Sequence, residues 1–485
     1  MSDRSRASGR KLVLLAIAGA SAAGCMVGPD FHRPAAPSDA SYIAEPQTEA
    51  RQGGPRFDAE SRVAANWWRI LGCPSIDVIV TRALAANPGL EAARATLRQN
   101  QDQLRAGYGV FFPQVDMRAG AGRQLYNPAP GSLPSRTFNL FTLSGTVSYA
   151  LDIWGGERRQ VEAQRAVVDA QRYAVAGAYV ALTSNVVNAV IAQAAYRAEI
   201  EATRATLVLL AQQVHIADAQ ASAGTASYSS VLSLESELAS TEATLPPLEE
   251  KIDQASNLLA ALAGATPANF SEPTPSLWEL RLPDTLPLTL PSKLVRQRPD
   301  ILIAESELHA ANASIGVATA AMLPNVTLSA TYGTNSTTAG DLFSPESAFW
   351  SAAAGLTQPL FHGGSLYYQR EAAVEARNAS AAQYRQTVLA AFQQVADTLR
   401  GLDHDAETLT AQTEAVATSD KFARLAQANY QAGTGTYLQV LVADTQYLRA
   451  HVGYIEAVAQ RLQDVVALYV ALGGGWWSAK TDGAR

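Results

Sequence analysis

Three short stretches of the sequence contain residue types that bind metals or phosphates in other proteins. Asp403-His404-Asp405 offers an imidazole and two carboxylates, but neighbouring helical residues diverge, because only positions three or four apart share a face. Gly473-Gly474-Gly475 follows an apolar helical stretch instead of a strand, which is typical of a helix C-cap. Asp300 follows Pro299 near a predicted helix start, where acidic residues cap the first turn. The histidines lack metal-ligand spacing, so we expect no catalytic residue, no metal site and no enzyme.

The N-terminus contains one residue whose chemistry is well defined. Four basic side chains within the first eleven residues precede an apolar run from Leu12 to Ala23, which is typical of a secretory signal and too short to span a membrane. Cys25 follows Ala22-Ala23-Gly24, an arrangement that resembles the bacterial lipobox. In that motif, cleavage leaves an N-terminal cysteine that carries an S-diacylglycerol and an N-palmitoyl chain. We expect removal of residues 1–24 and lipidation of Cys25, with a plain secreted protein as the alternative.

Charge and cysteine content limit the remaining classes. The 485 residues include 37 basic and 44 acidic side chains without a concentrated basic patch, which argues against nucleic acid as a partner. Cys73 is the second of two cysteines, so no intramolecular disulfide remains once Cys25 is acylated. We expect Cys73 to be a small buried residue. No segment after the signal has eighteen unbroken apolar residues, so no transmembrane helix is expected.

The elements that position these residues occur twice in the chain. Four short motifs recur in the same order, at offsets of 208 to 211 residues. The motifs and their repeats are Phe112-Pro113 and Leu323-Pro324, Ile153-Trp154-Gly155-Gly156 and Phe361-His362-Gly363-Gly364, Gly224-Thr225 and Gly433-Thr434, and Leu262-Ala263-Gly264 and Ala471-Leu472-Gly473. A constant offset indicates an internal tandem repeat whose two units are neighbours in space.

Helical stretches without proline dominate both units. We expect an extended segment that carries the acyl anchor (25–74), followed by the first repeat (75–264). A proline-rich connector (265–291) then leads to the second repeat (292–473) and a C-terminal tail (474–485). The helices are expected at 75–109 with an interruption at Asn87-Pro88, at 157–220, at 229–263 with a break at Pro246-Pro247, at 292–322 and at 365–430. The two longest would each measure about 100 Å. A helical barrel or long bundle made by several chains is therefore expected.

Strands are predicted between the first and second helices of each unit. Apolar residues alternate with Thr and Ser at 141–151, 326–332 and 350–356, and loop residues lie at 127–131 and 334–336. Two hairpins give four strands, which cannot close a barrel, and an open sheet edge cannot lie in lipid. The strands therefore form either a soluble sheet or, pooled by three chains, a twelve-stranded barrel. The alternation alone leaves both possibilities open.

Several motifs, taken together, are similar to those of one family. They span nearly the whole mature chain in the expected order. The motifs are Cys25-Met26-Val27-Gly28-Pro29-Asp30, Trp67-Trp68-Arg69, Tyr149-Ala150-Leu151-Asp152-Ile153-Trp154-Gly155, Pro291-Ser292-Lys293-Leu294-Val295, Arg298-Pro299-Asp300-Ile301 and Ala471-Leu472-Gly473-Gly474-Gly475-Trp476. The chain thus resembles the outer-membrane factors of the TolC class, in the OprM/NodT-like lipoprotein subgroup that serves resistance-nodulation-division (RND) efflux pumps.

The resemblance implies an α+β membrane protein in the outer membrane of a Gram-negative bacterium. Three copies would form a twelve-stranded outer-membrane β-barrel, continued by a long periplasmic α-helical barrel with an equatorial belt from the connectors. The implied partners are two further copies of the chain, a periplasmic adaptor protein, an inner-membrane RND pump and outer-membrane lipid. No cofactor is implied other than the lipid on Cys25.

The resemblance also assigns roles to the helix turns. Gly224, Thr225, Gly433 and Thr434 would form the periplasmic tip, where the adaptor docks and the tunnel narrows. Relatives often carry charged residues just after the second Gly-Thr, but the matching candidates for the gate here are uncharged, namely Gly435, Gln439 and Val442, with Tyr430 matching a tip tyrosine. Asp444, Glu235 and Glu237 lie nearby with unknown orientation. We expect fewer charged contacts at the gate and weaker block by cations.

The function implied is passive conduction of drugs or other small molecules from a periplasmic pump to the outside. Two alternatives remain open from the residues. The first is an outer-membrane duct for type I protein secretion, whose substrate is chosen by the inner-membrane partner. The second is a scaffold lipoprotein made of coiled helices, without a channel.

Overall fold

The structure, a computed structural model, describes residues 26–38, 41–43, 56–58, 63–127, 134–271 and 275–478. The predicted signal segment, Cys25, the last residues of the C-terminal tail and most of the loop predicted at 127–131 lie outside the described residues. Contacts within the chain define two compact units. The first contains Met1–Pro34, Leu97–Gln171 and Ala304–Tyr384, and the second contains Ala35–Thr96, Arg172–Ile303 and Arg385–Arg485.

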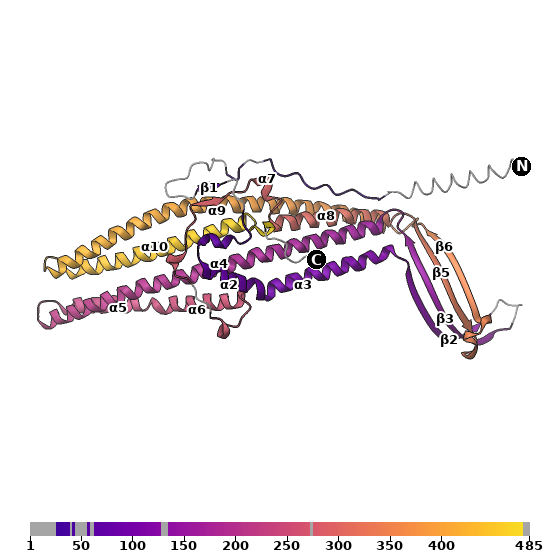
Figure 1. The fold of residues 1–485 in the computed structure, drawn as a ribbon, viewed down its shortest axis with the longest axis horizontal. Coiled ribbons are helices and arrows are strands. Elements are labelled where there is room, and N and C mark those ends of the chain that lie inside the picture. The colour runs from indigo at the N-terminus through magenta and orange to yellow at the C-terminus, as the bar shows by residue number, and fades with distance from the viewer. Residues whose placement is uncertain are drawn as a thin grey trace. The chain divides into compact units, whose positions relative to one another are not determined.

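The first unit contains an antiparallel sheet of four strands in the order β2-β3-β5-β6 (Figure 1). The strands are β2 (Gln114–Tyr126), β3 (Arg136–Leu151), β5 (Asn325–Ser336) and β6 (Ala348–Thr357). The two predicted hairpins are therefore confirmed, and β3 joins them by pairing with β5. The prediction of a loop at 334–336 is wrong, because these residues pair with Phe141–Leu143 and extend β5.

The strand register sorts the side chains of the sheet onto two chemically different faces, since directly paired residues point to the same side. One face is apolar. Its larger side chains are Val115, Met117, Leu143, Val147, Tyr149, Val326, Leu328, Tyr332, Trp350 and Leu356. The other face is rich in hydroxyl groups, and Thr146 and Thr331 form a hydrogen bond of 3.1 Å across β3 and β5. The predicted alternation is thus confirmed in β3, β5 and β6, and the register extends the two faces to β2.

Helices continue from the strands of the first unit. They are α3 (Pro88–Gly107), α4 (Gly156–Ser222), α8 (Pro299–Ala320) and α9 (Ser365–Gln431), of which the unit contains the ends nearest the sheet. Asp152 fixes the corner between β3 and α4, because its carboxylate accepts the N–H groups of Glu157 and Arg158 at 3.1 Å each. Gly155 lies in the same corner with φ of 77°, a left-handed conformation that favours glycine.

An N-terminal strap, residues 26–33, runs along α4 and α8 within the first unit. Val27 donates its N–H to the Trp154 carbonyl at 2.9 Å. Arg159 of α4 is 1% exposed, and its guanidinium pairs with Asp30 of the strap at 2.7 Å. Phe31 stacks on His309 of α8 with ring centroids 4.3 Å apart. The strap therefore holds the residue next to Cys25 beside the end of β3.

The second unit is helical. It contains α2 (Pro74–Ala86), α5 (Tyr228–Glu242), α6 (Leu245–Leu262), α7 (Pro291–Leu294), α10 (Tyr437–Ala471) and most of α4 and α9. The predicted interruption at Asn87-Pro88 is confirmed between α2 and α3. The predicted break at Pro246-Pro247 falls at 243–244, because prolines are accepted in the first turn of a helix, where their missing N–H is not needed.

Aromatic residues pack the core of the second unit. Trp67 stacks on Tyr469 of α10 with centroids 5.3 Å apart, and the Trp476 indole donates to the Gln297 carbonyl at 2.8 Å. Cys73 is buried in the same cluster, as predicted. Two short strands, β1 (Arg56–Asp58) and β4 (Thr285–Pro287), pair in parallel and connect the two proline-rich segments. The tryptophan pairs are thus packing anchors.

One helix among the described residues, α4, is long and apolar enough to cross a membrane by length and composition alone. Its most apolar window of eighteen residues has a mean hydropathy of 1.6, and 56% of that window is buried inside the protein. Such burial is typical of a helix in a protein core.

Candidate functional site

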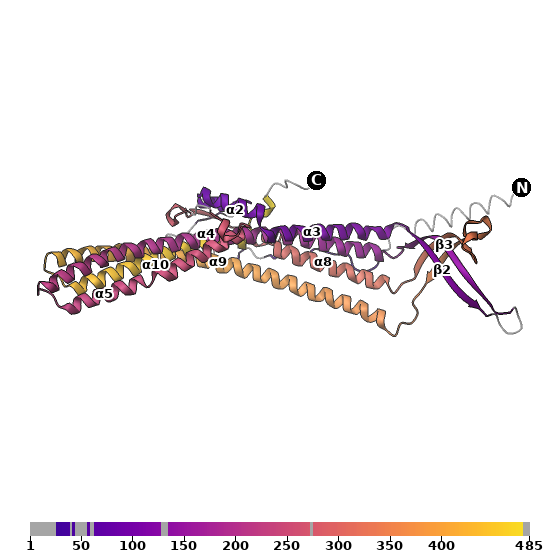
Figure 2. The same cartoon turned by 90° about the horizontal axis from the view of Figure 1, so that it is seen from below.

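The predicted tip residues form two turns with matching geometry. Gly224 follows α4 with φ of 72°, and Gly433 follows α9 with φ of 73°. The Thr225 hydroxyl donates to the Gln220 carbonyl at 2.9 Å, and the Thr434 hydroxyl donates to the Asn429 carbonyl at 3.1 Å. In each turn, glycine provides the left-handed residue that ends a helix and threonine binds a carbonyl left without a helical partner. Both turns lie at the same end of the second unit (Figures 1 and 2).

Three hydrogen bonds near this end join the α4–α5 hairpin to the α9–α10 hairpin; we call them the hairpin contacts. The Tyr430 hydroxyl of α9 donates to the Gln220 side-chain oxygen of α4 at 2.6 Å. The Thr445 hydroxyl of α10 shares its proton between Glu237 of α5 at 3.2 Å and the Leu441 carbonyl of its own helix at 2.8 Å. The third bond runs from the Gln213 amide of α4 to the Asp444 carboxylate of α10. Separating the two hairpins would require all three bonds to break.

Asp444 is buried between the hairpins, and Tyr437 is partly buried. Asp444 is 6% exposed, and burial raises its pKa, although the hydrogen bond from Gln213 acts in the opposite direction. Burial also raises the pKa of Tyr437, and the nearby carboxylates of Glu237 and Asp444 add to this effect. The Tyr437 hydroxyl has no hydrogen-bond partner among the described residues. The side chains of Asp444 and Tyr437 therefore pack between helices.

The structure gives the gate candidates different environments. Tyr430 forms a hairpin contact, whereas Gln439 accepts the Thr436 N–H at 3.1 Å and completes a capping box of α10. Gly435 donates its N–H to the Asn429 carbonyl at 3.0 Å, and Val442 is 41% exposed. Only Tyr430 among these four thus connects the two hairpins through a side chain.

Three residues of the hairpin contacts were not predicted from the sequence, namely Gln213, Gln220 and Thr445. Glutamine and threonine are common on helix surfaces, so their residue types give no signal. One signal was available for two of the contacts. Tyr430 lies 210 positions after Gln220, and Thr445 lies 208 positions after Glu237, both close to the repeat offset. These two contacts therefore join nearly equivalent positions of the two repeats.

A pair of carboxyl groups joins α9 and α10 elsewhere in the second unit. Burial, the hydrogen bond to Asp464 and the charge of Asp464 together raise the pKa of Asp405 to about 7, while Arg461 acts in the opposite direction. His404 points to Glu407, with its ring nitrogen 3.5 Å from the carboxylate. Adjacent residues of this stretch thus diverge, and the described residues contain no group of three potential metal ligands.

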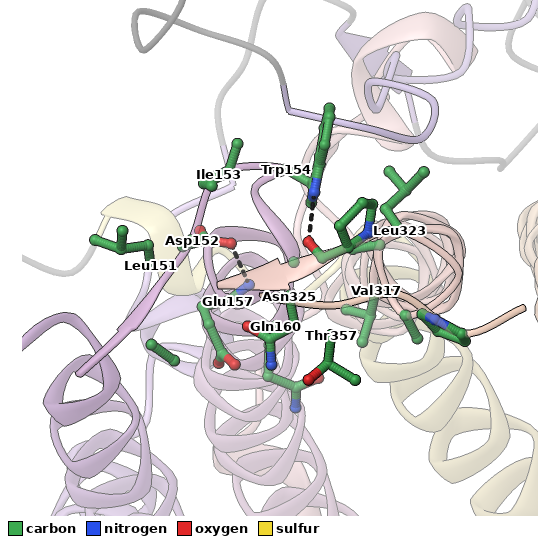
Figure 3. Close-up of a pocket in the computed structure, with 16 residues that line it drawn as sticks. Leu151, Asp152, Ile153, Trp154, Glu157, Gln160, Val317, Leu323, Asn325 and Thr357 are labelled. Carbon is green, nitrogen blue, oxygen red and sulfur yellow. Dashed lines mark hydrogen bonds between the residues drawn. The ribbon is translucent and has the colours of Figure 1, made fainter. Parts of the chain in front are cut away.

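A recess of about 570 Å³ lies in the first unit, where β3 meets α4 and α8 meets β5 (Figure 3). Trp154 closes one side by donating its indole N–H to the Pro324 carbonyl at 2.8 Å. The polar lining includes Glu157 and Gln160 of α4, together with Asn325 and Thr357 from the hydroxyl-rich face of the sheet. These polar groups can be hydrated. The residues drawn include no nucleophile paired with a base.

Comparisons with known proteins agree on one family. Residues 79–265 and 290–474 match the family model described as outer membrane efflux protein. The pyoverdine export outer membrane protein OpmQ of Pseudomonas aeruginosa is 30% identical over 456 residues, which cover 93% of this chain and 95% of OpmQ. The cation efflux system protein CusC of Escherichia coli is 28% identical over 459 residues, which cover 93% of this chain and 96% of CusC.

Solved structures share the fold. The outer-membrane channel OprN superposes on this chain with a TM-score of 0.86 at 26% sequence identity. The superposition covers 93% of this chain and 100% of the OprN chain.

Proposed function

The chain belongs to the outer membrane efflux protein family, and we propose that it forms the exit duct of a tripartite efflux system in the outer membrane. The duct conducts small molecules passively from a periplasmic pump to the outside. The observation that carries this proposal is the sheet, which has one apolar face, one hydroxyl-rich face and two edges without a strand partner among the described residues.

Three copies would satisfy the sheet in a membrane. Edge strands β2 and β6 leave backbone N–H and C=O groups unpaired, and each such group is costly in hydrocarbon. Twelve strands from three copies close a barrel, place the apolar face against lipid and place the hydroxyl-rich face around an aqueous lumen. The lipid on Cys25 adds a second attachment to the same membrane.

The helical part would form the periplasmic tunnel of the trimer. The turns at Gly224-Thr225 and Gly433-Thr434 are the proposed docking surface for a periplasmic adaptor, which connects the duct to an inner-membrane RND pump. The hairpin contacts are the bonds that opening would break within each chain. The adaptor opens the tip by binding more tightly to the open arrangement.

The compound exported is set by the partner pump in this proposal. OpmQ is named for pyoverdine export and CusC for cation efflux, although both align over nearly their whole length with this chain. The same duct architecture thus accompanies chemically different cargoes. Efflux names among these relatives also favour an efflux duct over a protein-secretion duct or a scaffold.

Conductance of the purified full chain in planar bilayers tests the proposal. We expect discrete current steps and a trimer by native mass measurement, whereas a scaffold lipoprotein would give neither. Deleting the gene should raise sensitivity to dyes, detergents or antibiotics, and returning the intact gene should restore resistance. A monomer without conductance would contradict the proposal.

A further inference from the structure

Two recesses adjoin in the first unit, where the sheet meets the helices. The first, of about 570 Å³, lies between the β3–α4 corner and the end of α8 (Figure 3). The second, of about 450 Å³, is lined by residues from the end of α3, from β2 and from β3. Ala150 of β3 and Glu157 of α4 line both recesses, so the two cavities adjoin at these residues.

The strand register places the second recess, like the strand residues of the first, on the hydroxyl-rich face of the sheet. Its lining includes Gln114, which pairs with Ser148, and Ala150, which pairs with Thr327. Ser148 and Ala150 lie two and four positions after Thr146, so these two pairs are on the same face as Thr146. In the proposed barrel this face surrounds the lumen. A solute in transit would therefore pass both recesses.

Glu157 gives the lining an uncompensated negative charge. Its carboxylate has no ion-pair partner among the residues that the structure describes. Asp152, which lines the first recess, pairs instead with Arg158 at 3.1 Å. No basic residue lines either recess within the described part of the chain. An organic cation in these cavities would therefore be attracted to Glu157 without repulsion from the lining.

Apolar side chains form the wall opposite the polar groups of the first recess. Val317, Ala321 and Leu323 line it from the end of α8 and the segment that follows. Gln160 and Thr357 add neutral hydrogen-bonding groups in the same part of the recess as Glu157 (Figure 3). Ligand pockets commonly have volumes of about 300–1,000 Å³ and combine apolar walls with a few polar groups. The first recess, of about 570 Å³, meets both conditions.

We propose that the first recess binds amphiphilic organic cations, with the ammonium group at Glu157 and the hydrocarbon body against Val317, Ala321 and Leu323. This inference rests on the proposed function, because cargo reaches the recess in transit only if the hydroxyl-rich face surrounds the lumen of a duct. It adds a chemical class of solute that the duct itself retains. An organic cation would then pass more slowly than an anion of the same size.

The site occurs once in each chain. Helix α4 begins at Gly156 and helix α9 begins at Ser365, so the residue of the second repeat that corresponds to Glu157 is Leu366. The second repeat therefore lacks the carboxylate. Three copies of the chain would carry three such sites around the lumen.

Binding at this site has to be weak, because a conducting pathway must release what it binds. Glu157 is only partly buried, so water competes for its carboxylate. The ion pair between Glu157 and an ammonium group should change the affinity by no more than about five-fold. We expect a dissociation constant on the order of 1 mM for a small aromatic amine.

Saturation-transfer NMR on the full chain, purified in detergent, measures such binding directly when empty micelles are subtracted. The probes are 2-phenylethylammonium and 3-phenylpropionate, which have similar size and opposite charge. We expect the ammonium compound to bind and the carboxylate compound to give no signal above the micelles. Glu157→Gln, which keeps the shape of the side chain, should raise the dissociation constant of the ammonium compound about five-fold.

Two further variants separate the recess from the lumen as a whole. Asp116→Asn removes another carboxylate from the hydroxyl-rich face, at a position that lines neither recess, and should leave the dissociation constant unchanged. Ala321→Phe narrows the first recess without changing its charge and should weaken binding. Ala321 is exposed, so the larger side chain displaces no packed atoms. Circular dichroism verifies that each variant is folded.

The outcomes distinguish the binding site from the duct. Absence of 2-phenylethylammonium binding, equal binding of 3-phenylpropionate, or an unchanged affinity in Glu157→Gln would overturn the site. Equal weakening by Glu157→Gln and Asp116→Asn would also overturn it, because the attraction would then belong to the whole lumen. Each of these results can occur in a chain that gives discrete current steps in planar bilayers. A monomer without conductance would instead contradict the proposed duct.

Discussion

Single hydrogen bonds at the tip connect helices that are about 210 positions apart in the sequence. Tyr430→Phe removes the donor to Gln220 while keeping the aromatic ring, and such a bond contributes about 1 kcal/mol net. If opening separates the hairpins, the open arrangement of each chain should become about five-fold more populated. Single-channel recording of the variant in planar bilayers measures this change directly.

Gln439→Ala provides a matched comparison for Tyr430→Phe. It alters a side chain in the same turn, but its partner is the Thr436 N–H of its own helix cap. We expect its open probability to stay close to that of the unchanged protein. Equal open probabilities for Tyr430→Phe and the unchanged protein would show that the hairpins do not separate during opening.

Asp405 makes stability depend on pH in the direction opposite to a surface carboxylate. Its pKa in the folded chain is about 7, above the unfolded value of about 3.9, so folding favours the protonated group. Its contribution is complete below about pH 4 and is lost as the pH rises to about 7. Asp405→Asn should therefore raise the thermal midpoint at pH 8 and leave it unchanged near pH 4, measured by circular dichroism.

The neighbouring Asp403→Asn controls for the loss of one negative charge from α9. We expect it to leave the dependence of the thermal midpoint on pH intact. If Asp405→Asn and Asp403→Asn changed that dependence equally, the partly buried pairing with Asp464 would not be its cause.

At the scale of elements, the corner between β3 and α4 depends on one carboxylate. Asp152 accepts two backbone N–H groups at the start of α4 and pairs with Arg158 at 3.1 Å. Asp152→Ala should destabilise the chain by about 1 kcal/mol, the usual cost of losing a helix cap. Thermal unfolding of the purified protein would show a lower midpoint, and Asp152→Asn, which keeps an acceptor, should lose less.

Element positions could largely be predicted from the sequence. Proline and glycine mark the helix ends at Asn87-Pro88 and at the tip turns, and period-two alternation marks the strands, because both signals act over a few residues. The end of β5 was missed because Asn335 and Ser336 have loop chemistry, yet pairing with β3 holds them in the sheet. Long-range pairing of this kind is not encoded locally.

The side-chain contacts of the tip could be predicted only in part. Tyr430 was identified through a family resemblance, and Asp444 was noticed without its orientation. The α-helical period did not settle that orientation, because packing between helices leaves Asp444 6% exposed, with Gln213 of α4 as its hydrogen-bond partner. Which polar residues face inward thus depended on the packing of two hairpins.

At the scale of the whole molecule, the burial of Asp444 bears on block by cations. A ring of acidic side chains around a narrow tip would bind multivalent cations, but Asp444 is hydrogen-bonded to Gln213 between helices, and the gate candidates are uncharged. We expect millimolar trivalent cations to reduce the single-channel current only weakly. Tight closure in planar bilayers at those concentrations would contradict this expectation.

Anchoring of the molecule can be tested independently of conduction. Cys25→Ser should abolish the proposed acylation, because it removes the thiol to which the diacylglycerol would be attached. Incorporation of labelled palmitate measures this change, and the unchanged protein serves as the positive control. Labelling of the variant would show that the lipid is attached elsewhere.

The hydroxyl-rich face of the sheet has a consequence for selectivity in the membrane. Along β3 and β5, seven inward positions of the proposed barrel carry short hydroxyl side chains, namely Thr142, Ser144, Thr146, Ser148, Thr327, Ser329 and Thr331. Such groups both donate and accept hydrogen bonds, and they carry no charge. Charge at this level of the proposed lumen comes instead from β2, where Asp116 and Arg118 pair with Thr146 and Ser144 on the same face, so discrimination by charge sign within the barrel would depend on β2.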